Sequence, residues 1–246
     1  MPTYERLEDL DDSALTARYA PPDGVESWLR VNFVSSLDGA VTVDGRSAGL
    51  SGAADMRVFK ILRMRCDALV VGAGTVRREA VHYRALRLTP DRTAWRREAG
   101  MPDHPTMAVV SRSADLNPEA PMFIHAPVRP IVITCQAAPA GAREALSETA
   151  EVIVAGDDGV DFSEAVRQLR KRGLRQILCE GGPHVLGEIT SADLVDEVCL
   201  TVSPLLAGAG AGRITAGPGS PVRRMRLSHV LEADDYLMLR YVRHDR

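Results

Sequence analysis

The sequence has 246 residues, of which 45% are hydrophobic, and a formal net charge of -3. This length and hydrophobic content are enough for one large α/β domain with a sizeable core. The slightly acidic balance excludes binding through bulk positive charge, so we predict neither nucleic acid nor membrane as a partner. No apolar run approaches the ~18 residues of a membrane span, and the first residues lack a signal-peptide pattern, so we expect a cytoplasmic protein.

Metal and disulfide chemistry is not expected. The four cysteines lie far apart among apolar residues and form no C-x-x-C pair, which is typical of reduced, buried thiols. The six histidines include no pair spaced by four residues, so we predict no metal site. The signatures of serine hydrolases and of P-loop proteins are also absent.

In chain order, residues 1–26 are expected to form an amino-terminal extension, with a helical turn near Leu7–Leu15, that wraps the domain or contacts a partner chain. Residues 27–246 are expected to form a single domain, because no linker rich in Pro, Gly or Ser divides them. The run Trp28–Val34 contains β-branched residues and predicts the first strand. Apolar residues at spacings of three and four predict a helix over Ala53–Arg65.

Short apolar runs and helical patterns then alternate. The predicted strands are Ala68–Val71, Met107–Val110, a weaker one near Pro121–His125, Ile131–Thr134, Val152–Ala155 and Gln176–Cys179. The predicted helices among them are Ala140–Glu148 and Phe162–Arg172. Alternating units of this length predict a mainly parallel sheet flanked by helices.

The carboxyl-terminal part has a different pattern, with strands that no helix separates. These predicted strands are Asp196–Pro204, Val222–Glu232 and Tyr236–Arg243. We expect antiparallel pairs there, with Asp234-Asp235 as a hairpin turn. The glycine-rich segment Leu206–Arg213 predicts a flexible loop, which could also close over a ligand.

Three glycine-marked turns each follow a predicted strand: Asp38-Gly39, Gly72-Ala73-Gly74-Thr75 and Glu180-Gly181-Gly182. Ligands of open α/β sheets bind beyond the carboxyl ends of strands, so these turns are expected to converge on one crevice. The second turn lacks the third glycine and the later acidic residue of a Rossmann fingerprint. The third opens a helix whose first amides suit an anion such as a pyrophosphate. A plain connection between strand and helix is the alternative.

Polar side chains at the predicted strand ends offer two kinds of chemistry. Asp38 and Glu180 are carboxylates at the turns, and Asp38 could either take part in chemistry or cap its own turn. Ser111-Arg112 follows another strand, and a hydroxyl beside a guanidinium suits a 2′-phosphate, which favours NADPH over NADH. A solvated surface pair is the alternative for Ser111-Arg112.

Five motifs occur in order along the chain: Ser36-Leu37-Asp38-Gly39, Asp67–Val76, Glu180–Pro183, Leu194–Glu197 and Ser203–Gly208. Together they resemble the reductase domain of the bifunctional riboflavin biosynthesis proteins, the RibD C-terminal domain, which has a dihydrofolate reductase-like fold. The resemblance implies a three-layer α/β/α fold with a mixed, mostly parallel sheet, NADPH as hydride donor, and a homodimer. It also implies a phosphoribosylamino-pyrimidine substrate, reduced from ribosyl to ribityl, as in 5-amino-6-(5-phosphoribosylamino)uracil reductases.

Carried over by position, the resemblance assigns roles to individual residues. The implied cofactor contacts are Gly72, Gly74, Thr75, Val76, Ser111, Arg112, Thr134, Gly181, Gly182 and Val185. The implied substrate contacts are Asn32, Ser36, Asp38 and Arg84. Asp38 and Glu180 are the catalytic candidates and would face the substrate or the nicotinamide; which of them relays a proton stays open.

Two features on the substrate side depart from the family. Ala40 stands where members often carry a basic residue, and Arg77–Arg84 replaces a segment that has an Asp-Pro and a later Thr and Arg near the substrate phosphate. The zinc deaminase signature, H-x-E with P-C-x-x-C, is absent from the sequence, so we predict a stand-alone reductase. The alternatives are a reductase of a pteridine such as dihydrofolate, and a non-catalytic NADP(H)-binding protein.

Overall fold

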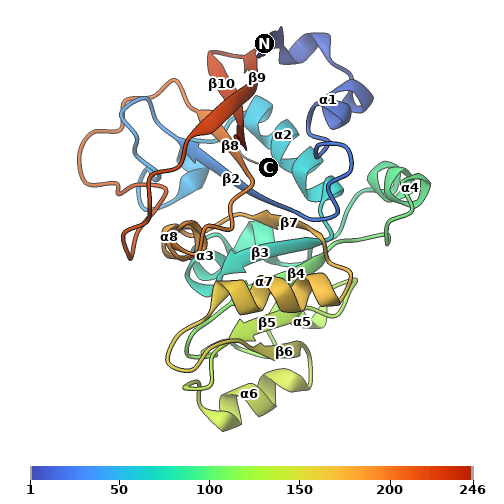
Figure 1. The fold of residues 1–246 in the computed structure, drawn as a ribbon, viewed down its shortest axis with the longest axis vertical. Helices are drawn as coiled ribbons and strands as arrows, with labels where there is room; N and C mark the ends of the chain where they lie inside the picture. Colours follow the sequence, from blue (N-terminus) through green and yellow to red (C-terminus); the bar gives the residue numbers. More distant parts are fainter. Residues whose placement is uncertain (1, 245–246) are drawn as a thin grey trace. The chain divides into compact units, whose positions relative to one another are not determined.

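The computed structural model describes residues 2–244. They fall into two compact units. The middle unit is Cys66–Leu178, and the outer unit consists of the described residues on either side of it, up to Arg65 and from Cys179. The chain has a mixed α/β fold with mostly parallel strands and antiparallel strands near the carboxyl terminus (Figure 1), which confirms the predicted fold class.

The middle unit is built on parallel strands in the order β7-β3-β4-β5-β6. Their bounds are β3 (Ala68–Gly72), β4 (Thr106–Val110), β5 (Ile131–Thr134), β6 (Glu151–Val154) and β7 (Gln176–Cys179), the last residue of which belongs to the outer unit. Every residue of β3 and β5 is buried. Helices that cover both faces of a parallel sheet bury its strands in this way, as the lack of polar alternation predicts.

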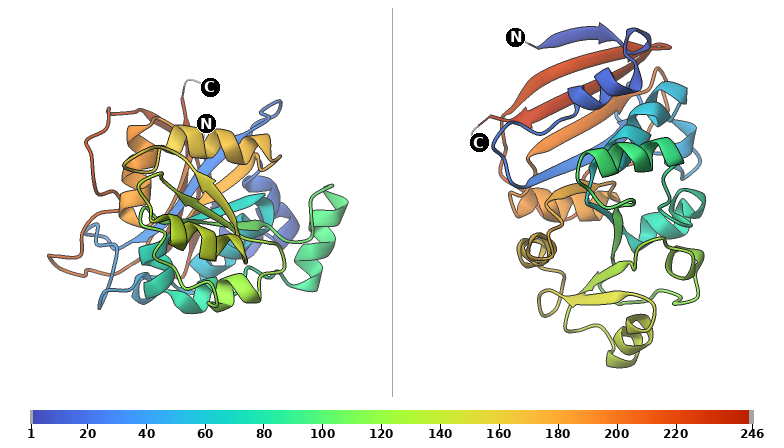
Figure 2. Two further views of the ribbon diagram at one scale, coloured as in Figure 1. Left: turned by 90° about the horizontal axis from the view of Figure 1, so that it is seen from below. Right: turned by 90° about the vertical axis from the view of Figure 1, so that its right-hand side faces the viewer.

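The helices of the middle unit follow from the order of its strands. They are α3 (Ala73–Arg78), α4 (Pro90–Glu98), α5 (Pro121–Ile124), α6 (Ala140–Ser147) and α7 (Phe162–Lys171). Because parallel crossovers are right-handed, the steps from β3 to β6 place their helices on one face, and the return to β7 places α7 on the other. Figure 2 shows α7 opposite α3 and α5, so this unit has three layers.

The strand predicted near Pro121–His125 is wrong, because these residues form the short helix α5. Pro121 occupies the first turn of α5, where a residue without an N–H is tolerated. Apolar runs as short as this one do not distinguish a strand from a buried helical turn.

The outer unit contains strands in the order β1-β9-β10-β8-β2. Their bounds are β1 (Thr3–Arg6), β2 (Trp28–Ser35), β8 (Glu197–Val202), β9 (Met225–Ala233) and β10 (Tyr236–Arg243), and the helices are α1 (Asp12–Arg18), α2 (Ala53–Arg65) and α8 (Pro183–Ser191). β10 pairs antiparallel with both β8 and β9. Asp234 and Asp235 form the hairpin turn with positive φ angles, as predicted.

The amino-terminal segment is bound to the outer unit along its length. β1 pairs in parallel with β9 at the edge of the sheet, a strand that the polar sequence Thr3–Arg6 did not predict. Farther along, Arg57 of α2 donates to the carbonyl oxygens of Leu7 at 3.0 Å and Leu10 at 2.6 Å. Arg65, also on α2, donates to the carbonyl of Thr16 at 3.0 Å.

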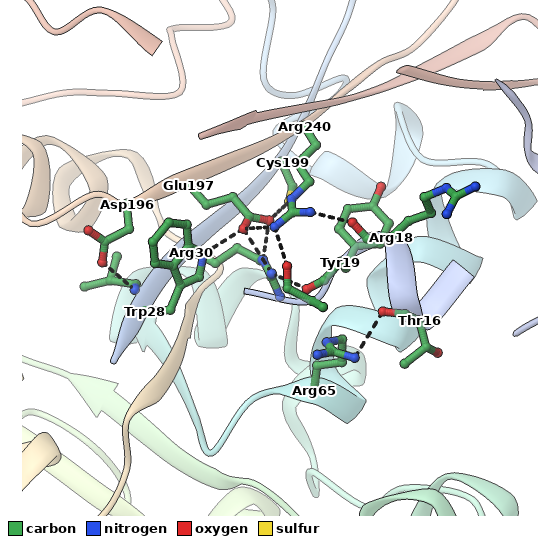
Figure 3. Close-up of polar contacts among 12 residues, drawn as sticks. Thr16, Arg18, Tyr19, Trp28, Arg30, Arg65, Asp196, Glu197, Cys199 and Arg240 are labelled. Atoms are coloured by element: carbon green, nitrogen blue, oxygen red, sulfur yellow. Dashed lines mark hydrogen bonds and ion pairs between the residues drawn. The ribbon is translucent and has the colours of Figure 1, made fainter. Parts of the chain in front are cut away.

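A buried network of charges lies beneath this segment (Figure 3). Glu197 accepts hydrogen bonds from Trp28 Nε1 at 2.6 Å, Arg30 Nε at 2.5 Å and Arg240 Nη2 at 2.9 Å. Arg30 also donates to the carbonyl of Tyr19 at 2.6 Å. Every side chain around Glu197 is buried, so the ion pairs satisfy charges that would otherwise be costly away from water.

Candidate functional site

The glycine turn that follows β3 leaves its backbone open. Gly72 ends β3 and precedes α3, which contains Gly74, Thr75 and Val76. A Cβ added to Gly74 would meet only Arg78 Nη2, at 3.9 Å. A ligand can therefore approach the main chain of Gly74 closely, which is a recurrent use of glycine beside nucleotides.

Ser111, Arg112 and Thr134 are brought together by the neighbouring strands β4 and β5. Ser111 N donates to the carbonyl of Ile133 at 3.0 Å, and Thr134 Oγ1 donates to the carbonyl of Arg112 at 3.2 Å. Ser111 and Thr134 are buried, whereas Arg112 is exposed. Arg112 Nε donates to the carbonyl of Asp158 at 2.8 Å, and within residues 2–244 the guanidinium makes no ion pair with a carboxylate. Its two terminal nitrogens are therefore available to an anion.

The turn after β7 combines a cis peptide bond, between Gly181 and Gly182, with the start of a helix. Gly181 has φ of 80°, and a Cβ there would lie 2.6 Å from Phe33 Cζ. Both facts require glycine at position 181. Helix α8 begins at Pro183 without a side-chain cap and contains the buried Val185. Its first amides lack intrahelical acceptors and can donate to an anion.

Glu180 is held by a buried arginine of the same unit. Arg63 Nε lies 2.8 Å from Glu180 Oε1, and Nη2 lies 2.6 Å from Oε2. The guanidinium also lies over the Phe59 ring, 4.1 Å from its centroid. A two-point bond of this kind fixes the orientation of the carboxylate. The geometry suits a fixed hydrogen-bond acceptor better than a proton donor.

Asp38 is an exposed carboxylate that connects two segments. It bonds to the Ser36 hydroxyl and accepts from the backbone N–H groups of Ala207 at 3.2 Å and Gly208 at 2.7 Å. These hydrogen bonds, that from Ser36 first, lower the pKa of Asp38 to about 2. Asp38 is therefore ionised at neutral pH and anchors the start of the glycine-rich loop.

The remaining predicted substrate residues lie in both units. Asn32 is half-buried on β2, opposite Cys199 of β8, and Ser36 is buried just beyond the end of β2. Ser36 Oγ accepts from the N–H of Ala40 at 2.9 Å. Arg84 is exposed in the middle unit, directly after a short 3-10 helix. Ser36 therefore contacts Asp38 directly, whereas Asn32 lies on the preceding strand.

Sequence reasoning missed another buried carboxylate, Asp55, in the first turn of α2. It bonds to the Ser51 hydroxyl and to the side chain of Thr201. Burial raises the pKa of Asp55, and the charge of Glu180 adds to that rise. The sequence offered one indication of this bond, namely that Ser51 and Asp55 stand together at a helix start. Serine and aspartate are also common at helix starts as ordinary caps, so their presence does not distinguish a functional site.

Neither a membrane-spanning helix nor a metal-binding cluster occurs within residues 2–244. None of the helices there has the length and apolar character needed to cross a membrane. The same residues hold no group of three or more His, Cys, Asp or Glu side chains placed to bind a metal ion.

Parallel strands that end in glycine turns, together with the antiparallel carboxyl-terminal strands, define the class: an α/β protein with a dihydrofolate reductase-like fold. The chain belongs to the RibD C-terminal domain family, whose model matches residues 27–239. The resemblance inferred from the five ordered motifs is thereby confirmed.

Two relatives and one solved structure illustrate the match. The 2,5-diamino-6-ribosylamino-4(3H)-pyrimidinone 5′-phosphate reductase of Methanothermobacter thermautotrophicus is 30% identical over 193 residues, 76% of this chain and 82% of that protein. The reductase of the same name from Archaeoglobus fulgidus is 26% identical over 204 residues, 82% of this chain and 92% of that protein. A pyrimidine reductase-like protein from Corynebacterium diphtheriae shares the fold, with a TM-score of 0.81 at 24% identity over 94% of this chain and 99% of its own.

Proposed function

We propose that this protein is an NADPH-dependent reductase of 2,5-diamino-6-ribosylamino-4(3H)-pyrimidinone 5′-phosphate, converting the ribosyl group to ribityl. One observation carries the proposal: the relatives named for this activity match most of the chain and most of their own length. This substrate is a phosphoribosylamino-pyrimidine of the predicted class, but it differs in the ring from the uracil form.

The choice of NADPH over NADH is supported by Arg112. Arg112 is exposed and its guanidinium has no carboxylate partner among the described residues, and Ser111 precedes it in the chain. A guanidinium fork binds a phosphate monoester through two parallel hydrogen bonds, which a free ribose hydroxyl cannot match. Thr134 belongs to this group because it holds the main chain of Arg112.

The glycine turns are proposed to contact the rest of the cofactor. In the middle unit these contacts come from Gly72, Gly74, Thr75 and Val76, where the backbone is open at Gly74. In the outer unit they come from Gly181, Gly182 and Val185, where the uncapped start of α8 offers amide donors to a pyrophosphate. Both features fit the polar parts of a nicotinamide dinucleotide.

Substrate recognition is proposed for Asn32, Ser36, Asp38 and Arg84. Asp38 is ionised, and as an exposed acceptor it is proposed to bond to a sugar hydroxyl. Arg84 is exposed and can pair with the substrate phosphate. The side chain of Glu180 is fixed by Arg63 and serves as a hydrogen-bond acceptor that orients bound groups.

The chemistry consists mainly of positioning. NADPH, when bound, supplies the hydride. The protein contributes the alignment of donor and acceptor and the exclusion of water. Because Asp38 is ionised and Glu180 is fixed by Arg63, we propose that these two side chains orient the reacting groups.

The assembly is proposed to be a homodimer, on the basis of the family resemblance. Small-angle scattering of the purified chain gives the mass directly. A monomer at all concentrations would contradict this part of the proposal and leave the assigned reaction unaffected.

The substrate is tested by following NADPH oxidation with a panel of compounds. We expect turnover with the diaminopyrimidinone phosphate and none with dihydrofolate. The corresponding uracil compound is the third compound of the panel. Dihydrofolate reduction alone would replace the proposed substrate by a pteridine. Binding of NADP without any turnover would favour a non-catalytic binding protein.

A further inference from the structure

The loop that follows β6 contacts the arginine proposed to bind the 2′-phosphate. This loop, called here the 156–159 loop, consists of Gly156, Asp157, Asp158 and Gly159. Arg112 Nε donates to the carbonyl of Asp158 at 2.8 Å. Arg112 and Asp158 are 46 residues apart, yet they meet because β4, β5 and β6 are neighbours whose carboxyl ends share one edge.

The position of the Asp158 carbonyl is determined by bonds on both sides of it. The N–H of Gln136 donates to the carbonyl of Gly156 at 2.9 Å, and the N–H of Ala137 donates to that of Asp157 at 2.8 Å. Two residues after the loop, the N–H of Asp161 donates to the carbonyl of Ala155, the residue that follows β6, at 3.0 Å. The 156–159 loop is therefore attached to both the β5 and the β6 strand ends.

Gly156 is the residue that permits this closure. Its φ is 87°, and an added Cβ would lie 2.3 Å from the carbonyl oxygen of Gly159 and 2.9 Å from the N–H nitrogen of Asp161. Both neighbours are backbone atoms, so a side chain at 156 must displace the loop. Gly159 differs, since a Cβ there would meet nothing within 4 Å. The two glycines thus form a matched pair for mutation.

Arg112 is held at its main chain and at its side chain. Its carbonyl accepts from Thr134 Oγ1 at 3.2 Å and Cys135 Sγ at 3.4 Å, while its Nε is held by the Asp158 carbonyl. The loop also carries two exposed carboxylates, Asp157 and Asp158. Because Arg112 binds a neutral carbonyl and not one of these carboxylates, its charge remains available while its direction is fixed.

We propose that the 156–159 loop is a specificity element that aims the Arg112 guanidinium at the 2′-phosphate of the cofactor and so sets the preference for NADPH over NADH. This inference rests on the proposed cofactor. Without the Asp158 carbonyl, Arg112 would be free to turn toward the acidic side chains of the loop. The contribution of the loop is therefore confined to the phosphate and does not extend to the nicotinamide.

The test measures the binding of NADP⁺ and NAD⁺ by calorimetry, independently of turnover. Gly156→Ala is expected to lower NADP⁺ affinity about tenfold or more, the equivalent of one charge-assisted hydrogen bond, and to leave NAD⁺ affinity within about twofold. Gly159→Ala is the matched control and should leave both affinities unchanged. An equal loss for both cofactors in Gly156→Ala would overturn the inference, because it would show a general structural role.

Two arginine variants separate this inference from the proposed cofactor. Arg112→Ala should abolish the preference for NADP⁺; a preference that survives would refute the assignment of Arg112 and with it the inference. If Arg112→Ala loses the preference and Gly156→Ala keeps it, only the role of the loop is refuted. Should Gly156→Ala fail to fold, Arg112→Lys replaces it, because lysine keeps the positive charge but lacks the Nε donor that bonds to the Asp158 carbonyl. Retained preference in Arg112→Lys would then overturn the inference, and lost preference would support it.

Discussion

Replacing Glu197 by glutamine should destabilise the protein by about 3 kcal/mol. Glu197 is fully buried between Arg30 and Arg240. Burial raises its pKa, but the charges and hydrogen bonds of the two arginines outweigh burial and hold the pKa at about 2, below the ordinary 4.5. At about 1.36 kcal/mol per pKa unit, that difference corresponds to about 3 kcal/mol. Breaking a buried ion pair costs about 3–5 kcal/mol, which is the same range.

The assay is urea unfolding of the wild type and Glu197→Gln at two pH values. Because the folded pKa lies below the unfolded one, the stabilisation by Glu197 is complete above pH ~4.5 and is lost as the pH falls toward ~2. At pH 3 the wild-type advantage should have shrunk by about 2 kcal/mol relative to pH 7.

The control is Glu151→Gln, which removes an exposed pair with Arg172 at 2.5 Å. It should cost less than about 1 kcal/mol. A cost for Glu197→Gln no larger than that of the control would refute the reasoning. A difference between wild type and Glu197→Gln that stays constant between pH 7 and pH 3 would refute it as well.

Three further variants test the candidate site. Asp38→Asn should lower kcat and leave NADP⁺ affinity almost unchanged, as measured by steady-state kinetics and calorimetry; an unaltered kcat would remove Asp38 from the reaction. Arg84→Ala should raise KM for the phosphorylated substrate about tenfold with little effect on kcat, and an unchanged KM would place the phosphate elsewhere. Arg63→Met should lower the free energy of unfolding by about 3–5 kcal/mol, because it leaves the Glu180 carboxylate buried without its guanidinium; adding Glu180→Gln should recover part of the loss, and no recovery would show that the ion pair is not the cause.

The regular elements with long apolar patterns could be predicted from the sequence. Helix Ala53–Arg65 and strand Tyr236–Arg243 have the predicted bounds, and α7 ends one residue earlier than predicted. In each of these elements the apolar residues repeat at a regular spacing, and polar or turn residues stand at its ends. The edge strand Thr3–Arg6 could not be predicted, because three of its four residues are exposed and its polar sequence carries no apolar alternation.

The contacts that hold the charged groups could not be predicted in the same way. Glu197 and Arg30 are 167 residues apart in sequence, and Glu180 and Arg63 are 117 apart. Ion pairs between residues so far apart in sequence depend on which strands become neighbours, and no local sequence pattern predicts them. The sequence indicated that Glu180 and Asp38 stand at strand ends, but the hydrogen-bond partners that hold these two carboxylates emerged only from the fold.

For the candidate cofactor residues too, local features could be predicted from the sequence and long-range contacts could not. Glycine spacing indicated the turns at Gly74 and Gly181, because close approach and positive φ select glycine locally. The residue pair Ser111-Arg112 was also visible in the sequence. The contact between Arg112 and Asp158 was not, since it arises from two loops that meet at the ends of β4 and β6.

We propose that this protein transfers a hydride from NADPH to the sugar of a phosphoribosylamino-pyrimidine. The direct test incubates the protein with 2,5-diamino-6-ribosylamino-4(3H)-pyrimidinone 5′-phosphate and NADPH carrying deuterium at both positions of nicotinamide C4. Mass spectrometry of the product should show a ribityl compound with one deuterium on C1′, the carbon that is the anomeric centre in the substrate. A ribityl product without deuterium, or no ribityl product in the presence of folded protein, would contradict the claim.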